Sequence, residues 1–278
     1  MRTPRRRLYG SNAKLERRGI PLTFTAYFEA RPDGVHPAPV ARSPWNPDHQ
    51  SGVAVAALLT HALEQVPTAA PMMFARLVFD ILRPVPMQPI TVSTRIIRDG
   101  KRMQNLAAEL TYDGEVVASA SALRVRLAET PRVMPTVGPY PTPDAAPREP
   151  LARRDPRRTG METRVVKGRL IEAGPGVLWA RVDGDLFPGQ PASPLVTAMM
   201  TCDLGSAIAA ELDTREWSFA NLDISAHLVR PPVSEWILID AHTITHGQGV
   251  ALVDSLLCDE QGMIGRAHQT LFVAPLAR

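Results

Sequence analysis

One carboxylate stands out among the side chains that could do chemistry. Asp203 lies within MMTCDLGSAIAAEL (199–212), a stretch of small and apolar residues that predicts a helix. An ionised side chain in such a helix is costly unless a partner neutralises it or a reaction uses it. Two interpretations follow: a structural carboxylate bonded to a neighbouring strand, or a general base that takes a proton from water.

The other reactive residue types give weaker signals. Cys202 adjoins Asp203, but adjacent helical residues face different directions, so we expect a buried, inert thiol. His242 and His246 share one strand face without an obvious third ligand, which argues against zinc. The chain has no Gly-x-Ser-x-Gly, P-loop or Gly-x-Gly-x-x-Gly motif, which argues against a serine-elbow hydrolase, an NTPase and a Rossmann dehydrogenase. We therefore expect no metal and no cofactor.

Composition limits the setting of this chemistry. The 278 residues suffice for one large domain or for two of about 140 residues. The net charge of +3 comes largely from the N-terminal tail and from residues 148–160, so the near-neutral body gives no sign of a nucleic-acid partner. No apolar segment follows the basic N-terminus and no run of 18 apolar residues exists. With only two cysteines, the sequence predicts a cytoplasmic protein without a membrane span.

The sequence contains an internal repeat. FARLVFDILRPVP (74–86) resembles FANLDISAHLVRPPV (219–233), and the two Arg-Pro pairs are 147 residues apart. YDGEVVASASALRV (112–125) resembles EQGMIGRAHQTLFV (260–273), with Gly114 and Gly262 148 residues apart. Two anchors that agree to within one residue indicate a duplication, because one accidental match would not produce them.

Each copy has the same expected elements. Buried helices are predicted at 51–66 and 194–212, with Ser51 and Ser193 as N-caps. Strands are predicted at 74–82, 90–98 and 103–126, the last broken by a hairpin turn at 112–114, and then at 219–229, 234–245, 249–258 and 262–274. Further β-like segments lie at 21–30 and 163–182.

One helix covered by an antiparallel meander describes a hotdog, so the sequence predicts an α+β double hotdog. In this fold two tandem hotdog repeats each wrap an antiparallel β-sheet around a central helix, and we expect the two sheets to join edge to edge. Two unrelated α+β domains would not explain the common spacing. The expected divisions are a basic N-terminal tail (1–20), an N-terminal hotdog (21–127), a Pro-rich linker (128–160) and a C-terminal hotdog (161–278).

These segments resemble a known family. SPWNPDHQSGVAVAALLTHALEQ and RLVFDILRPVPMQPITVSTRIIRDGKRMQNLAAELTYDGEVVASASALRVR resemble the N-terminal hotdog of the acyl-CoA thioesterase II (TesB-like) family. NLDISAHLVRPPVSEWILIDAHT and DEQGMIGRAHQTLFV resemble its C-terminal hotdog, so the resemblance covers roughly residues 22–127 and 160–274.

The resemblance implies hydrolysis of acyl-CoA thioesters by a water that an Asp, a Thr or Ser, and a Gln hold together. Asp203 matches the Asp, Gln269 matches the Gln, and Asn221 stands where the family has the hydroxyl residue. Asparagine cannot relay a hydroxyl proton, but its amide can orient a water. No acyl-enzyme is required. Oxyanion donors are expected from backbone N–H groups at a helix N-terminus, at Gln50, Ser51 and Gly52 or at Thr197.

Two other functions stay open at this stage. One is an acyl-thioester-binding protein with weak or lost activity, which the exchange at Asn221 favours. The other is an enoyl-thioester hydratase, a chemistry that usually needs a His–Asp pair that neither helix offers. The expected partners are the acyl-thioester substrate and further copies of the chain in a homo-oligomer.

Overall fold

The computed structural model describes residues 26–150 and 160–276. Its helices are α2 (Gly52–Glu64), α3 (Pro194–Asp203) and α4 (Gly205–Ile208), with 3₁₀ turns η1 (Pro39–Ala41) and η2 (Pro143–Ala145). The strands before the linker are β1 (Phe28–Arg31), β2 (Gly34–Pro37), β3 (Met72–Ile81), β4 (Thr91–Asp99), β5 (Met103–Tyr112) and β6 (Glu115–Arg126). Those after it are β7 (Met161–Lys167), β8 (Gly176–Val182), β9 (Asp185–Phe187), β10 (Gln190–Pro191), β11 (Trp217–Leu228), β12 (Ile237–Thr245), β13 (Val250–Asp259) and β14 (Gly262–Pro275). The expected basic tail lies outside the described residues.

The first predicted helix is confirmed as α2. Ser51 caps it, because its side-chain oxygen accepts a hydrogen bond from the Ala54 N–H at 3.2 Å. Most of its residues are buried, and alanines at 54, 56 and 57 let other elements approach its axis closely. The helix is therefore a core element surrounded by protein.

The second predicted helix begins as expected, but it is not continuous to residue 212. Ser193 caps α3 and Pro194 is its first residue, yet α3 ends at Asp203 and the short α4 ends at Ile208. Beyond Leu204 the backbone carbonyls accept hydrogen bonds from other segments: Ala207 from the Ile171 N–H at 2.7 Å and Ala210 from the Gly174 N–H at 2.8 Å. These tertiary bonds replace helical ones and end the helix early.

One antiparallel sheet of ten strands runs through the molecule in the order β4-β5-β6-β3-β11-β14-β13-β12-β8-β7. The strands predicted from residue 74 onward are confirmed, with 103–126 divided into β5 and β6 and 163–182 into β7 and β8. Of the predicted segment 21–30, residues 21–25 lie outside the described residues and β1 begins at Phe28. The halves meet where β3 pairs with β11, in a register that places Phe79 opposite Ile224. Outward from this junction the order is β3, β6, β5, β4 on one side and β11, β14, β13, β12 on the other.

The same irregularity occurs in both junction strands. The register of β3 with β6 shifts between Phe74 and Arg76, and that of β11 with β14 shifts between Asn221 and Asp223. Phe74 and Asn221 are separated by the 147 residues of the sequence repeat. A β-bulge bends a strand and re-aims its side chains, so both halves carry this device at matching positions.

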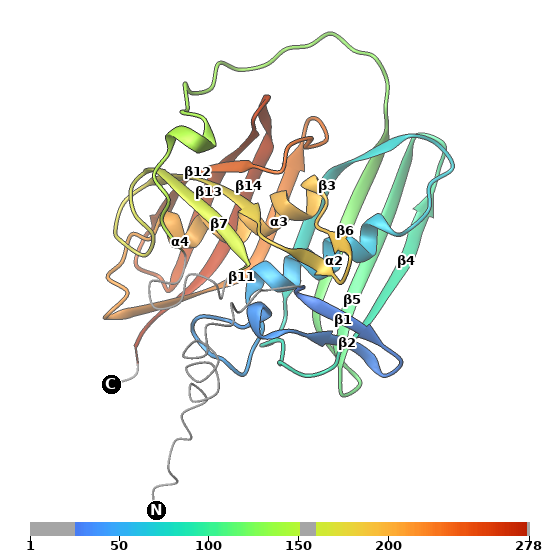
Figure 1. The fold of residues 1–278 in the computed structure, drawn as a ribbon, viewed down its shortest axis with the longest axis horizontal. Helices are drawn as coiled ribbons and strands as arrows, with labels where there is room; N and C mark the ends of the chain where they lie inside the picture. The colour runs from blue at the N-terminus through green and yellow to red at the C-terminus, as the bar shows by residue number, and fades with distance from the viewer. Residues whose placement is uncertain (1–25, 151–159, 277–278) are drawn as a thin grey trace, which may run out of the picture.

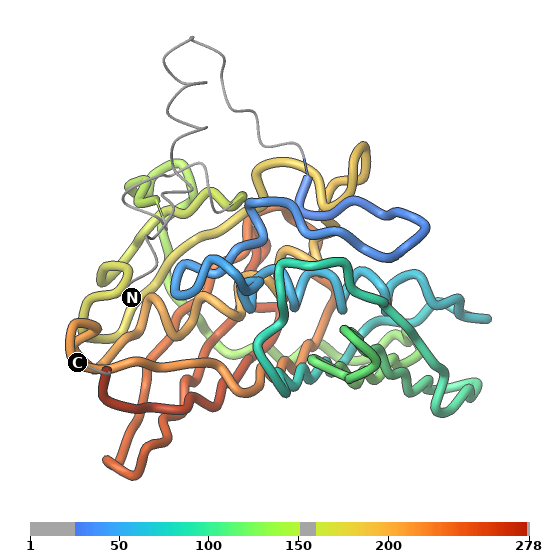
Figure 2. The backbone as a smooth tube through the Cα atoms, turned by 90° about the horizontal axis from the view of Figure 1, so that it is seen from below, coloured from blue at the N-terminus to red at the C-terminus, as the bar shows by residue number. Residues whose placement is uncertain are grey.

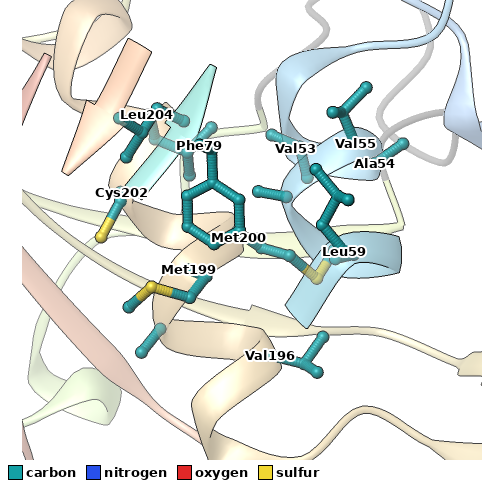
Figure 3. Packing of buried hydrophobic residues seen from close by; sticks show 14 of the residues in the cluster. Val53, Ala54, Val55, Leu59, Phe79, Val196, Met199, Met200, Cys202 and Leu204 are labelled. Atoms are coloured by element: carbon teal, nitrogen blue, oxygen red, sulfur yellow. The ribbon is translucent and has the colours of Figure 1, made fainter. Parts of the chain in front are cut away.

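Helices α2 and α3 lie side by side at the centre of the fold (Figure 1). They run antiparallel, since Gly52 at the start of α2 lies against Asp203 at the end of α3, while Glu64 at the end of α2 contacts Ser193 at the start of α3. Figure 3 shows side chains of both helices, among them Leu59 and Met200, in one apolar core. The helix pair thus joins the two halves in addition to the β3–β11 junction.

Smaller elements cover the helices. Figure 2 shows the β1–β2 hairpin, in blue, on the side of α2 away from the sheet, and Tyr27 and Phe28 belong to the same core.

The segment between β6 and β7 also contacts the strands that follow it. Its Tyr140 hydroxyl donates a hydrogen bond to Asp240 at 2.6 Å, and the Pro141 carbonyl accepts one from the Trp179 indole at 2.9 Å.

The two Arg-Pro pairs of the repeat occupy different environments. Arg230 forms a two-pronged ion pair with Asp259, whose side chain is fully buried and also accepts hydrogen bonds from the N–H groups of Val233 and Gln261. Arg83 pairs with Glu115, but both side chains are more than half exposed. Only the Arg230–Asp259 ion pair therefore contains a buried charge that would lose its compensation if the partner were removed.

We expect Arg230→Ala to lower the free energy of unfolding by roughly 3 kcal/mol or more, because the Asp259 carboxylate would stay buried without its cation. Arg83→Ala is the matched control and should cost less than about 1 kcal/mol, since water screens an exposed pair. Chemical denaturation of both variants measures the difference. Equal losses would contradict this assignment of the two pairs.

Candidate active site

Asp203 is the last residue of α3 and faces the beginning of α2. The approach is so close that a Cβ atom added to Gly52 would lie 2.2 Å from Asp203 Oδ1 and 2.8 Å from Oδ2. The backbone N–H of Val53 donates a hydrogen bond to the carboxylate. The first turn of α2 thus directs unpaired N–H groups and the positive end of its dipole at Asp203.

Burial is the dominant influence on the charge of Asp203. It raises the pKa of this carboxyl to about 6, against the opposing effect of hydrogen bonds from Asn221 and from the Val53 N–H. Asp203 therefore holds a proton more strongly than an exposed aspartate does and is still mostly ionised at neutral pH. These are the properties of a general base.

Asn221 reaches Asp203 from the bulge of β11. Its Nδ2 donates a hydrogen bond to Asp203 Oδ1 at 2.6 Å, while its Oδ1 is buried and accepts no hydrogen bond from residues 26–150 or 160–276. Asp223, two residues later, accepts a hydrogen bond from the Thr270 N–H at 2.6 Å and so ties the bulge to β14. Sequence reasoning missed this role of Asp223, whose signal is an acidic residue inside an otherwise half-buried strand.

Gln269 lies on β14 with its side chain buried. Its Nε2 donates a long hydrogen bond, 3.4 Å, to the backbone carbonyl of Asp203, and its Oε1 has no partner in the described part of the chain. A Cβ at Gly205 would lie 2.5 Å from this Oε1. A side chain at position 205, two residues after Asp203, would therefore clash with the Gln269 amide, and glycine avoids this clash.

The structure brings Asp203, Asn221, Gln269 and Gly52 together, but not the other residues expected at the site. The N–H groups of Gln50 and Ser51 already donate to Val85 and Ala41, at 2.7 and 2.8 Å. Thr197 lies six residues before Asp203, about 9 Å along the helix axis. Its N–H and its hydroxyl both donate to the Ser193 carbonyl, so neither is available as an oxyanion donor.

Two aromatic side chains contact each other just before Asn221 in β11. Phe219 precedes Asn221 by two residues, and its ring meets Trp45 edge-on with 5.8 Å between ring centres. Trp45 is 61% exposed and belongs to the loop that leads into α2. Next to Phe219, a cavity of about 10 Å³ lined by residues that include Ser206 and Leu271 has room for about one water.

The described residues give no support to metal or thiol chemistry. Within residues 26–150 and 160–276, no three His, Cys, Asp or Glu side chains are placed to bind a metal ion. Cys202 is a free, buried cysteine, and burial raises the pKa of its thiol well above the ordinary range.

None of the helices within residues 26–150 and 160–276 is long and apolar enough to cross a membrane.

Comparison with known families identifies two matching domains. The chain matches the acyl-CoA thioesterase N-terminal domain over residues 41–125 and the acyl-CoA thioesterase C-terminal domain over residues 134–273. It belongs to the acyl-CoA thioesterase family. The protein is accordingly an enzyme of the thioester hydrolase class. No curated protein matches the chain in sequence.

Solved structures with a hotdog fold are similar over most of the chain. A conserved hotdog protein from Alicyclobacillus acidocaldarius is 17% identical, with a TM-score of 0.71 over 90% of this chain and 96% of that one. An acyl-CoA thioesterase II, TesB2, from Mycobacterium marinum is 19% identical, with a TM-score of 0.62 over 86% and 97%. A TesB protein from Mycobacterium avium subsp. paratuberculosis is 17% identical, with a TM-score of 0.62 over 84% and 91%. At these identities the likeness establishes the hotdog fold.

We expect Gly52→Ala to lower turnover of acyl-CoA by about 10² or more, because the added methyl group would displace the Asp203 carboxylate by a substantial part of an ångström. Val53→Ala is the control, since it keeps the N–H that binds Asp203 and should retain turnover within a few-fold. Thiol release measures activity and thermal unfolding verifies the fold. Parental turnover in a folded Gly52→Ala variant would contradict the importance of this contact.

Proposed function

We propose that this protein hydrolyses acyl-CoA thioesters by direct attack of a water that Asp203, Asn221 and Gln269 hold. The observation that carries the proposal is that two side-chain amides contact Asp203, Asn221 at its buried carboxylate and Gln269 at its backbone carbonyl, and that the oxygens of both amides are buried and unpaired among the described residues. Buried polar atoms nearly always have partners, so unpaired acceptors beside a carboxylate favour a bound donor. Water is such a donor.

The hydrogen-bond inventory supports this role for the water. Asn221 Nδ2 occupies one oxygen of Asp203, which leaves the second oxygen to accept a proton. A water there can donate one hydrogen to Asp203 and the other to an amide oxygen of Gln269 or Asn221. Its lone pair then points away from both acceptors and toward an incoming carbonyl carbon.

In the proposed step, the water oxygen bonds to the thioester carbon while one of its protons moves to the Asp203 carboxylate. The carbonyl π electrons move to oxygen and form a tetrahedral oxyanion. Collapse of this intermediate breaks the C–S bond, and the proton on Asp203 passes to the departing sulfur. A carboxylic acid and free CoA thiol result, Asp203 is again ionised, and no acyl-enzyme forms.

The Gly52 N–H is the proposed donor to the oxyanion. It has no hydrogen-bond partner in the described ranges, unlike the N–H groups of Gln50 and Ser51. It belongs to the first residue of a 13-residue helix, where the dipole favours negative charge. A donor of this kind commonly contributes about 10²–10³ in rate.

We further propose that the fold is a double hotdog of two tandem repeats. Three observations support this: the strand order that is the same outward from the β3–β11 junction, the bulges 147 residues apart, and the antiparallel pair of capped helices. In this arrangement the first repeat supplies Gly52 and the second supplies Asp203, Asn221 and Gln269. The site thus forms between the repeats.

We expect Asp203→Asn to lower turnover by roughly 10²–10⁴, because the amide keeps the shape of the carboxylate but accepts no proton. Folding should survive, since a buried charge becomes a neutral group. Release of free thiol from a panel of acyl-CoAs measures the loss, and thermal unfolding verifies the fold. Hydrolysis at the parental rate would show that the carboxylate is structural and would refute the mechanism.

The pH profile provides a separate test. Because the ionised form of Asp203 is the base, kcat/KM should fall as the pH drops through about 6, the raised pKa of this carboxyl. The residual activity of Asp203→Asn should lack this acid limb. An acid limb that the variant retains would mean that another group is the base.

We also propose that the chain forms a homodimer or a larger assembly. Apolar side chains remain exposed on one face of the neighbouring strands β13 and β14, namely Val250, Leu252 and Phe272, with Val250 directly opposite Phe272. Burial of such a patch between copies is favourable. Light scattering at micromolar concentration should give at least twice the monomer mass of 30.4 kDa, whereas the monomer mass would overturn this proposal.

A further inference from the structure

A second cavity lies at the opposite end of the helix pair from Asp203. It measures about 480 Å³ and its lining includes Glu64, Met73, Phe74, Ser193, Leu195 and Leu228. This volume is within the range of small-molecule sites, and most of the lining is apolar. None of Asp203, Asn221 and Gln269 contributes to it.

The cavity contains an acid that the proposed hydrolysis does not use. Glu64 ends α2, and both of its carboxyl oxygens lie within hydrogen-bond distance of Ser193 Oγ, at 2.9 and 2.8 Å. Burial raises the pKa of this carboxyl. One hydroxyl satisfies only part of the hydrogen-bonding capacity of a carboxyl group, so Glu64 can bind a further polar group in the cavity.

The guanidinium of Arg124 also lines this cavity, near Glu64. Arg124 donates to the backbone carbonyls of Leu63 and Val66, both at 2.7 Å, and its guanidinium lies 4.3 Å from the centre of the Phe74 ring. Its charge lowers the pKa of Glu64 in opposition to burial. The acid and the cation offset each other, which favours an uncharged ligand.

The elements around this cavity match those around Asp203. In both places the capped start of one central helix meets an acid near the end of the other: Gly52 meets Asp203, and Ser193 meets Glu64. In both places a bulged strand contributes a side chain at the repeat spacing, Asn221 in one and Phe74 in the other. The cavity is therefore built like the candidate active site.

Two exchanges distinguish this cavity from the candidate active site. Phe74 provides no amide to orient a water, and Pro194, the first residue of α3, has no N–H to donate to an oxyanion where α2 has Gly52. An acid alone, without a held water and without this donor, lacks the parts that hydrolysis needs. The second cavity can therefore bind a ligand but is not equipped to hydrolyse it.

We propose that this cavity is a second, non-hydrolytic binding site for an acyl thioester. This inference rests on the proposed function, because it assigns to the second cavity the substrate class of the first. The apolar walls around Met73 and Leu195 receive the acyl group. A free lone pair of Glu64 accepts a hydrogen bond from an uncharged amide N–H of the adjoining pantetheine arm, while the Ser193 hydroxyl keeps its bond to Glu64.

The test counts binding sites on the full chain. The probe is S-(2-oxoheptyl)-CoA, in which a methylene group separates sulfur from the carbonyl so that no thioester can be cleaved. Isothermal titration should give two sites per chain for the parent and one site for Met73→Trp, which fills the second cavity. Glu64→Gln, a near-isosteric change, should weaken the second site at least 10-fold. Both variants should keep parental turnover of acyl-CoA.

Each alternative outcome is decisive. One site per chain in an active parent would overturn the inference and leave the proposed function intact, whereas an inactive parent would overturn the proposed function itself. Two sites that respond to neither variant would locate the second ligand elsewhere and would also overturn the inference. If Met73→Trp does not fold, Glu64→Gln with its small change of shape still decides.

Discussion

The contact between the start of α2 and the Asp203 carboxylate constrains more of this structure than any other. A buried carboxylate needs compensation, and here the Val53 N–H, the helix dipole and the Asn221 amide supply it. The contact exists only because residue 52 has no side chain. It also requires the central helices to run antiparallel, so that the end of one meets the beginning of the other.

The proposed role of Asp203 as a base depends on a balance of opposing effects on its pKa. Complete compensation by hydrogen bonds would lower the pKa of the carboxyl and weaken it as a proton acceptor, while burial alone would keep it protonated at neutral pH. The observed set of partners leaves the pKa at about 6. The bulge of β11 contributes to this balance, because the Asp223–Thr270 hydrogen bond fixes the segment that presents Asn221.

Sequence reasoning succeeded where the information is local. Ser51 followed by an apolar stretch identified α2, and the alternating segments around residues 112–114 identified the β5–β6 hairpin. It failed at Leu204, because the bonds that end the helix come from residues 168–175, which no helical pattern contains. Nor could it show that the N–H groups of Gln50 and Ser51 already have hydrogen-bond partners, because those partners lie elsewhere in the fold, while the N–H of Thr197 donates within its own helix. The approach of Gly52 to Asp203 is visible only in three dimensions.

The β3–β11 junction also affects the order in which the chain can fold. About half of the chain separates the paired residues of these strands, and contacts between distant residues form late because loop closure costs entropy. Until β11 arrives, β3 has an open edge of unpaired N–H and C=O groups. A nascent chain that has completed only its first half could then pair this edge with β11 of another molecule. Domain-swapped dimers joined through β3 and β11 are thus the misassembly to which this architecture is most exposed.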